Sequence, residues 1–296
     1  MARGVRVLLA LLLCSCGGEE RPRGEDQPPV VTSEDAGVRV PSAPYDLDTP
    51  TEAFALSEEL REISGVTVLP DGRLAVVQDE VGMLFVLNPE TAFIEERHYF
   101  EDGADYEGVE LAGGRMFVLR NTGTLLELEN WQGLDITIRH HATPLTREND
   151  TEGITYDATT NRILMACKEY GGPLVGERER AVYAYDLGAE IYLADPAYRF
   201  NMDAMPAELR EVADFKPSAI ALHPITGELY VLSSTARGLV ALGTDGSIRH
   251  SWRLKGNRFE QPEGLAFSPD GTMWMTSEGV EGPGRVFRFD PLTSTP

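Results

Sequence analysis

A short phrase occurs five times along the chain, and its spacing restricts the fold more than any other feature of the sequence. The copies occupy residues 61–68, 105–111, 150–157, 216–222 and 261–267. Four copies share a glycine, and the fourth copy has Ala219 at that position. From Gly65 to Gly264, the shared positions are 43, 45, 66 and 45 residues apart. A period near 45 residues is typical of β-propellers, in which each repeat forms one four-stranded blade.

Each copy begins a similar series of predicted strands. A turn containing Gly, Pro, Asn or Asp follows the phrase, and two further apolar runs follow the turn. A fourth run is more polar in segments 93–100, 134–140 and 247–254. Continuously apolar strands are buried on both faces, whereas alternating strands have one face in water. The sequence therefore predicts an all-β propeller whose four-stranded blades are buried near the axis and exposed at the rim.

The copies indicate five blades, with six as the alternative because one interval has 66 residues. The surplus in that interval is too short for a further blade. We assign it to residues 170–180 and 186–214, and we expect a short helix at 206–212. Few residues follow the third strand of the last copy, so segment 52–56 is expected to supply the missing outer strand and to close the ring.

The composition is that of a globular protein, with 42% hydrophobic and 25% charged residues. The net charge is −22 for 296 residues. A nucleic-acid-binding protein normally presents a basic face, so nucleic acid is not an expected partner. The excess of carboxylates suits solubility or, where carboxylates converge, the binding of a cation.

The first residues resemble a bacterial lipoprotein signal. Arg3 and Arg6 precede the apolar run 7–13, and the sequence Leu-Cys-Ser-Cys at 13–16 follows it. We expect residues 1–15 to be removed as a signal peptide and Cys16 to carry the lipid, which would attach the protein to a membrane. A plain secretory signal is the alternative. The expected location is the bacterial cell envelope, at the outer membrane or the periplasmic face.

Two further segments follow the signal. Residues 16–44 are rich in Pro, Glu, Asp, Gly and Ser and have no apolar periodicity, which predicts a disordered tether. Residues 45–296 contain all five copies of the phrase and are expected to form the propeller domain.

Polar residues occur at corresponding places in the copies. In an up-and-down blade, the start of the first strand and the end of the second strand lie on the same face of the ring. This places two groups of carboxylates around one mouth of the central channel, with Glu62, Glu107, Glu152 and Glu263 expected to point toward a common axis. The carboxylates expected at this mouth are Glu62, Asp79, Glu107, Glu152, Glu169, Glu263 and Glu278.

Like charges held close together raise one another's pKa unless a positive charge lies among them. One solution is a hard cation with oxygen ligands, for which calcium is the best match. The other is internal pairing with the nearby basic residues Arg120, Lys168 and Lys216. The glutamate before each glycine could instead serve the backbone as a hydrogen-bond acceptor. The Gly-rich segment 169–180 leaves from the same mouth and is either a lid or a solvated loop.

The succession of these motifs resembles the SdiA-regulated family, also called YjiK/CarP-like. The resemblance covers about residues 45–290 and rests on Glu-Ile-Ser-Gly at 62–65, Asp-Tyr-Glu-Gly at 105–108, the segment 149–157, Lys-Glu at 168–169, Gln-Pro-Glu-Gly at 261–264 and Ser-Glu at 277–278. It implies a cell-envelope β-propeller, a link to calcium in some members, and no established enzyme activity. The chain departs from the pattern at Ala219, at Ser234, at Arg120-Asn121 and in a longer insertion after Glu169.

Together these observations predict a lipid-anchored envelope propeller that binds a divalent cation or a small ligand at an acidic channel mouth, in a non-enzymatic binding or signalling role. The alternative is a calcium-dependent hydrolase, resembling a propeller phytase or a lactonase, that uses the same mouth. There, Glu107, Glu152 and Glu263 would hold the metal, and Arg120 and Lys168 would receive an anionic group. A third possibility is a protein-interaction platform that uses the blade rims. The chain contains no Gly-x-Ser-x-Gly, His-Glu-x-x-His, Cys-x-x-Cys or P-loop sequence.

Overall fold

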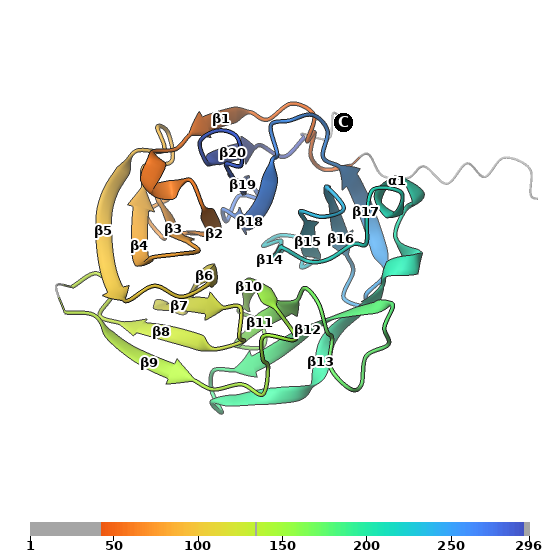
Figure 1. The fold of residues 1–296 in the computed structure, drawn as a ribbon, viewed down its shortest axis with the longest axis horizontal. Coiled ribbons are helices and arrows are strands. Elements are labelled where there is room, and N and C mark those ends of the chain that lie inside the picture. Colours follow the sequence, from red (N-terminus) through yellow and green to blue (C-terminus); the bar gives the residue numbers. More distant parts are fainter. Residues whose placement is uncertain (1–42, 134, 293–296) are drawn as a thin grey trace, which may run out of the picture. The chain divides into compact units, whose positions relative to one another are not determined.

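The computed structural model describes residues 43–133 and 135–292. Within these residues, the strands form five antiparallel sheets of four strands each. The sheets are arranged as blades around one axis, with β2, β6, β10, β14 and β18 innermost (Figure 1). The predicted five-bladed propeller is therefore confirmed, and the alternative of six blades is not.

The strands of each blade run from the axis to the rim. The first blade contains β2 (Ile63–Val68), β3 (Leu74–Gln78), β4 (Gly82–Leu87) and β5 (Ile94–Glu101). The second contains β6 (Tyr106–Ala112), β7 (Arg115–Arg120), β8 (Leu125–Glu129) and β9 (Thr137–His141). The third contains β10 (Thr151–Asp157), β11 (Arg162–Cys167), β12 (Glu179–Asp186) and β13 (Ile191–Asn201). The fourth contains β14 (Ala219–Leu222), β15 (Leu229–Ser233), β16 (Gly238–Leu242) and β17 (Ile248–Arg253).

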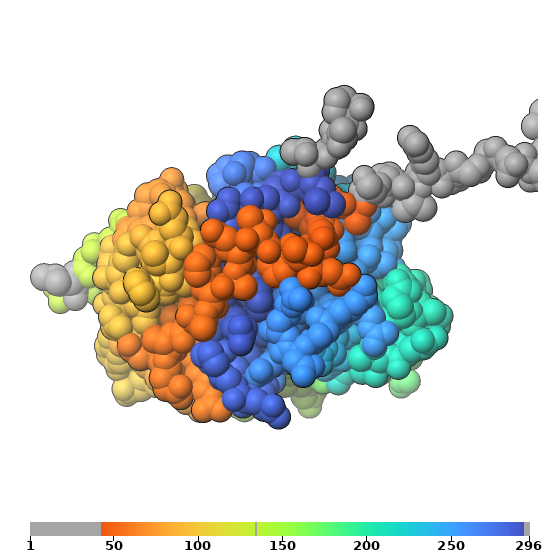
Figure 2. Space-filling model, turned by 90° about the horizontal axis from the view of Figure 1, so that it is seen from above, coloured from red at the N-terminus to blue at the C-terminus, as the bar shows by residue number. Residues whose placement is uncertain are grey.

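The fifth blade joins the two ends of the described chain. It contains β18 (Gln261–Phe267), β19 (Met273–Glu278), β20 (Arg285–Phe289) and, as its outer strand, β1 (Glu52–Ala55). β1 pairs antiparallel with β20, with Glu52 opposite Arg288 and Ala55 opposite Arg285. Figure 2 shows this contact as N-terminal residues (orange) packed against C-terminal residues (blue). The expected closure by an N-terminal strand is thus present.

The long interval between the third and fourth copies contains one strand that the sequence reasoning did not assign. β13 has 11 residues, and its exposed and half-buried residues follow no strict alternation. It contains Pro196, which a strand tolerates at the edge of a sheet. The remaining residues form two short helices, the 3₁₀ turn η2 (Met202–Ala204) and α1 (Ala207–Arg210). The expected helix at 206–212 is therefore present but shorter. A further 3₁₀ turn, η1 (Glu58–Leu60), precedes the first blade.

The shared glycine of the phrase lies where neighbouring inner strands approach each other closely. A Cβ atom added to Gly65 would lie 2.6 Å from the Cα atom of Gly108. A Cβ atom added to Gly264 would lie 2.6 Å from the carbonyl oxygen of Ser64 in the next blade. Backbone packing around the axis therefore explains why the phrase keeps a glycine.

Candidate functional site

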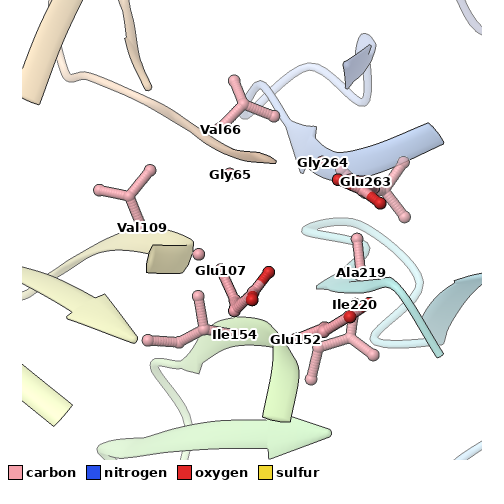
Figure 3. A pocket seen from close by; sticks show the side chains of 12 residues that line it. Gly65, Val66, Glu107, Val109, Glu152, Ile154, Ala219, Ile220, Glu263 and Gly264 are labelled. Carbon is pink, nitrogen blue, oxygen red and sulfur yellow. The ribbon is translucent and has the colours of Figure 1, made fainter. Parts of the chain in front are cut away.

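Three glutamates from three blades surround a small cavity on the propeller axis. Glu107 lies on β6, Glu152 on β10 and Glu263 on β18, each directly before the shared glycine of its copy. Figure 3 shows the three side chains around one space at the centre of the ring. We call Glu107, Glu152 and Glu263 the axial cup. The same cavity is also lined by the apolar residues Val66, Val109, Ile154, Ile220 and Leu265, one from each blade.

The axial cavity is small. The volume open to the centre of a water molecule is about 10 Å³. That is close to the least volume that holds one water molecule. The cup therefore has room for one water or one ion and excludes a sugar or nucleotide from the axis.

The remaining two blades have a serine where the cup has a glutamate. Ser64 Oγ donates a hydrogen bond of 2.7 Å to the carbonyl oxygen of Tyr106, and Ser218 Oγ donates one of 2.8 Å to that of Pro262. These residues link neighbouring blades. Repeat symmetry led us to expect Glu62 to point toward the axis, but Ser64 occupies the position before the glycine and Glu62 does not line the axial cavity. The alignment of the copies on their shared position places Ser64 and Ser218 in line with the three glutamates.

Glu62 belongs to a second level of polar residues, nearer the mouth. At this level, the residue three positions before the shared glycine meets the end of the second strand. The backbone N–H of Asp79 donates to the carbonyl oxygen of Glu62 at 3.2 Å, and Asn121 Nδ2 donates to Asp105 Oδ2 at 2.6 Å. The structure therefore brings the two predicted groups of residues to the same end of the ring.

Gln261 connects the two levels in the fifth blade. Its Nε2 atom donates to Glu263 Oε1 at 2.7 Å and to Glu278 Oε2 at 2.5 Å. Sequence reasoning missed this residue, which the copies place in line with Glu62 and Asp105. A neutral amide between two carboxylates orients them but supplies no charge, so the repulsion between them remains.

The three basic residues predicted at the mouth pair with three different glutamates. Lys168 Nζ pairs with Glu152 Oε1, and Lys216 Nζ pairs with Glu169 Oε1. Arg120 pairs with Glu101 at the end of β5, and its guanidinium lies 5.5 Å from the ring centre of Tyr106. Arg120 thus neutralises a residue outside the predicted set of mouth carboxylates.

Five carboxylates have no such partner. We call Glu62, Asp79, Glu107, Glu263 and Glu278 the acidic half of the mouth; they come from the first, second and fifth blades. Among the residues that the structure describes, none of the five has a Lys, Arg or His nitrogen within 4.0 Å. The mouth is therefore divided into an acidic half and a half in which Lys168 and Lys216 compensate the carboxylates.

The protonation of the acidic half reflects this lack of partners. Burial and then the charge of Glu263 raise the pKa of Glu107 to about 8. Burial, a hydrogen bond with Glu62 and the charge of Glu263 raise the pKa of Glu278 to about 9. Burial, followed by the charge of Glu62, raises the pKa of Asp79 to about 6. Glu107 and Glu278 therefore hold protons near neutral pH in the absence of a cation.

One oxygen atom of Glu152 has no partner among the described residues. The residue is only 6% exposed, and its Oε2 atom accepts no hydrogen bond from any described residue. Burial raises the pKa of Glu152 well above its usual range, and Lys168 acts in the opposite direction. A buried acceptor without a donor is costly, so this oxygen is a position at which a ligand is favoured.

The chemistry of these residues fits a hard cation, because carboxylate oxygens are the ligands that Ca²⁺ prefers. Within residues 43–133 and 135–292, no group of three or more His, Cys, Asp or Glu side chains is close enough to hold a metal as placed. The cup carboxylates would have to rotate toward the axis to share one ion.

Comparison with known families gives one match, which spans most of the chain. The profile of the SdiA-regulated family matches residues 46–290. The chain belongs to the SdiA-regulated family. The resemblance found in the repeated phrase is therefore confirmed. Comparison with curated proteins gives no match for this SdiA-regulated chain.

Solved structures similar to this SdiA-regulated protein are distant in sequence. Glutaminyl cyclase from Myxococcus xanthus is 13% identical with a TM-score of 0.58, over 82% of this chain and 95% of that chain. A luciferin-regenerating enzyme is 14% identical with a TM-score of 0.51, over 83% of this chain and 96% of that chain. At this level of identity the likeness shows the fold alone.

Several predictions concern the N-terminal region. The signal peptide at 1–15, the lipid site at Cys16 and nearly all of the tether at 16–44 lie outside the described residues. In the part of the chain that is described, no helix is long and apolar enough to cross a membrane.

Proposed function

We propose that this SdiA-regulated protein is a lipid-anchored propeller of the bacterial cell envelope whose acidic mouth binds a divalent cation, with calcium as the best match. The observation that carries the proposal is the acidic half of the mouth, in which five carboxylates have no basic partner among the described residues. A divalent cation would offset the mutual repulsion among these carboxylates.

Two features favour an ion over a larger ligand. The axial cavity, at about 10 Å³ for the centre of a water molecule, has room for little else. The unpartnered Oε2 atom of Glu152 belongs to a residue that lines the same cavity and can accept a ligand there.

Calcium suits this mouth better than magnesium. Ca²⁺ accepts six to eight oxygen ligands in irregular arrangements, whereas Mg²⁺ demands near-ideal octahedral geometry. The donors here are side-chain carboxylates that come from different blades, which favours the more tolerant ion.

The hydrolase alternative receives less support. It requires Arg120 and Lys168 to accept an anionic group, yet Arg120 pairs with Glu101 and Lys168 pairs with Glu152. Neither cation is free for a phosphate or carboxylate of a substrate. The geometry therefore favours binding over hydrolysis.

The test is a calcium titration of the full-length protein in detergent, followed by calorimetry. We expect heat of binding at or below millimolar calcium and a weaker response to magnesium. Glu107→Gln should weaken calcium binding by about tenfold or more, because it removes one buried ligand charge. Glu90→Gln is the matched control, since Glu90 is exposed on the turn after β4 and the change in charge is the same. Absence of binding at millimolar calcium would overturn the proposal.

A further inference from the structure

Lys168 supplies a positive charge to the axial cup. It follows directly after β11, its side chain is 23% exposed, and its Nζ atom pairs with Glu152 Oε1. Its charge also lowers the pKa of Glu107 and of Glu263, against the larger effect of burial. The ammonium group therefore acts on all three carboxylates of the cup.

A cation that enters the cup would lie close to the positive charge of Lys168. Glu152 offers two oxygens, of which Oε1 pairs with Lys168 and Oε2 has no partner among the described residues. Use of Oε2 alone would leave the entering cation beside an ammonium group, and two positive charges at such a distance repel strongly in a partly buried site. Full engagement of Glu152 by a divalent ion therefore requires the ammonium to leave.

We propose that Lys168 competes with a divalent cation for the cup: its ammonium group pairs with Glu152 in the cation-free protein, and a divalent cation binds by displacing the ammonium group. This inference rests on the proposed function. Lys168 then sets the affinity, because every binding event must first break the Lys168–Glu152 ion pair. The site would respond only to cation concentrations high enough to do so.

The structure also offers the displaced ammonium a second carboxylate. Asp150 is half-buried, and its carbonyl oxygen accepts a hydrogen bond of 2.8 Å from the backbone N–H of Lys168. Burial raises the pKa of the Asp150 carboxyl, and the charge of Lys168 acts in the opposite direction, so the two groups already interact. A lysine side chain is long and flexible enough to move from Glu152 to Asp150 without a change in the backbone.

Replacement of Lys168 should therefore tighten binding. Lys168→Met keeps the apolar stem and removes the ammonium, and we expect its calcium dissociation constant to fall by about tenfold or more. Lys255→Met is the matched control: Lys255 pairs with Asp48, its side chain is 66% exposed, and its loss should change the constant by no more than about twofold. Lys168→Arg, which keeps the charge, should bind calcium no more tightly than the wild type.

The measurement is isothermal titration of full-length protein with calcium chloride, with circular dichroism to confirm that each variant is folded. If Lys168→Met fails to fold, Lys168→Gln serves in its place, because its amide can still donate to Glu152. Wild-type binding without a gain in either variant would overturn the inference and leave the proposed function standing. Binding by Lys168→Met but not by the wild type would mean that calcium cannot displace the ammonium group, and it would overturn both the inference and the proposed function of the natural chain. No binding by the wild type or by either variant would overturn the proposed function and the inference together.

Discussion

Burial and neighbouring carboxylates both favour the protonated form of Glu107, and this links the cup to the stability of the fold. The pKa of Glu107 rises from 4.5 to about 8 in the folded protein. Between these values the folded protein binds more protons than the unfolded chain, so stability falls with rising pH. This contribution is fully present below pH 4.5 and is lost as the pH rises through about 8.

We therefore expect the metal-free protein to lose stability between about pH 5 and pH 9, by a few kcal/mol for Glu107 alone. Urea unfolding at several pH values in the presence of a chelator measures this slope. Glu107→Gln should flatten it, and Glu90→Gln should not. Some slope should remain in Glu107→Gln, because the pKa values of Asp79 and Glu278 are raised in the same direction. An unchanged slope in Glu107→Gln would contradict the assignment of a buried proton to this residue.

Some features of the candidate site could be predicted from the sequence alone, and others could not. Glu107, Glu152 and Glu263 could be predicted to face the axis, because each precedes the glycine that every blade but the fourth keeps there. The partner of Arg120 could not be predicted. Arg120 lies opposite Tyr106 in the ladder between β6 and β7, and its contact with Glu101 depends on the packing of the first blade against the second. Such a contact between blades leaves no periodic signal in the chain.

At the scale of whole strands, the inner ladder of the propeller allows little room for added atoms. A Cβ atom at Gly65 would meet the Cα atom of Gly108 at 2.6 Å and the backbone nitrogen of Val109 at 2.7 Å. Backbone atoms of a neighbouring strand cannot move aside as a flexible side chain would. We expect Gly65→Ala to lower the free energy of unfolding by about 1–3 kcal/mol, measured by chemical denaturation.

The fourth blade provides the matched control for this prediction. Ala219 already occupies the equivalent position, and it is buried and lines the axial cavity. Ala219→Gly removes a methyl group and adds backbone freedom, which should cost no more than about 1 kcal/mol. If Gly65→Ala were as stable as the wild type, close packing of the backbone would not explain the conserved position within the repeats.

Strands differ in how readily their sequence reveals them. β1 could be predicted because the fifth repeat has no fourth strand of its own, and ring closure demands one. β13 was not predicted because it is an outer strand without an alternating sequence pattern, and its extended conformation depends on packing against β12. It pairs with β12 from Asp186 at one end to Glu179 at the other, with a register shift between Val182 and Ala184. A bulged edge strand that contains proline resembles a loop in sequence.

The whole ring is held at the axis by contacts that join one blade to the next. Thr67 Oγ1 donates to Glu110 Oε1 at 2.8 Å, and the backbone N–H of Tyr156 donates to Glu110 Oε2 at 3.2 Å. Thr155 Oγ1 in turn accepts from the backbone N–H of Leu222 at 3.2 Å. These bonds connect the first four blades. The half-buried Glu110 is satisfied by its donors, in contrast to Glu152, and this difference separates a structural carboxylate from a candidate ligand.

The proposed lipid anchor lies in the N-terminal region and the proposed cation site in the propeller, so the two proposals can be tested separately by mutation. Cys16→Ser removes the thiol that would carry the lipid, and we expect the protein to move from the membrane fraction to the soluble fraction. Cys14→Ser is the matched control, because Cys14 lies within the signal peptide predicted at 1–15 and would be removed with it. Fractionation of cells that express each variant, with labelling by radioactive palmitate, measures both effects. Retention of Cys16→Ser in the membrane, or release of Cys14→Ser, would contradict the lipid anchor at Cys16. Calcium binding should be unchanged in Cys16→Ser, since the mouth is built from residues of the propeller alone.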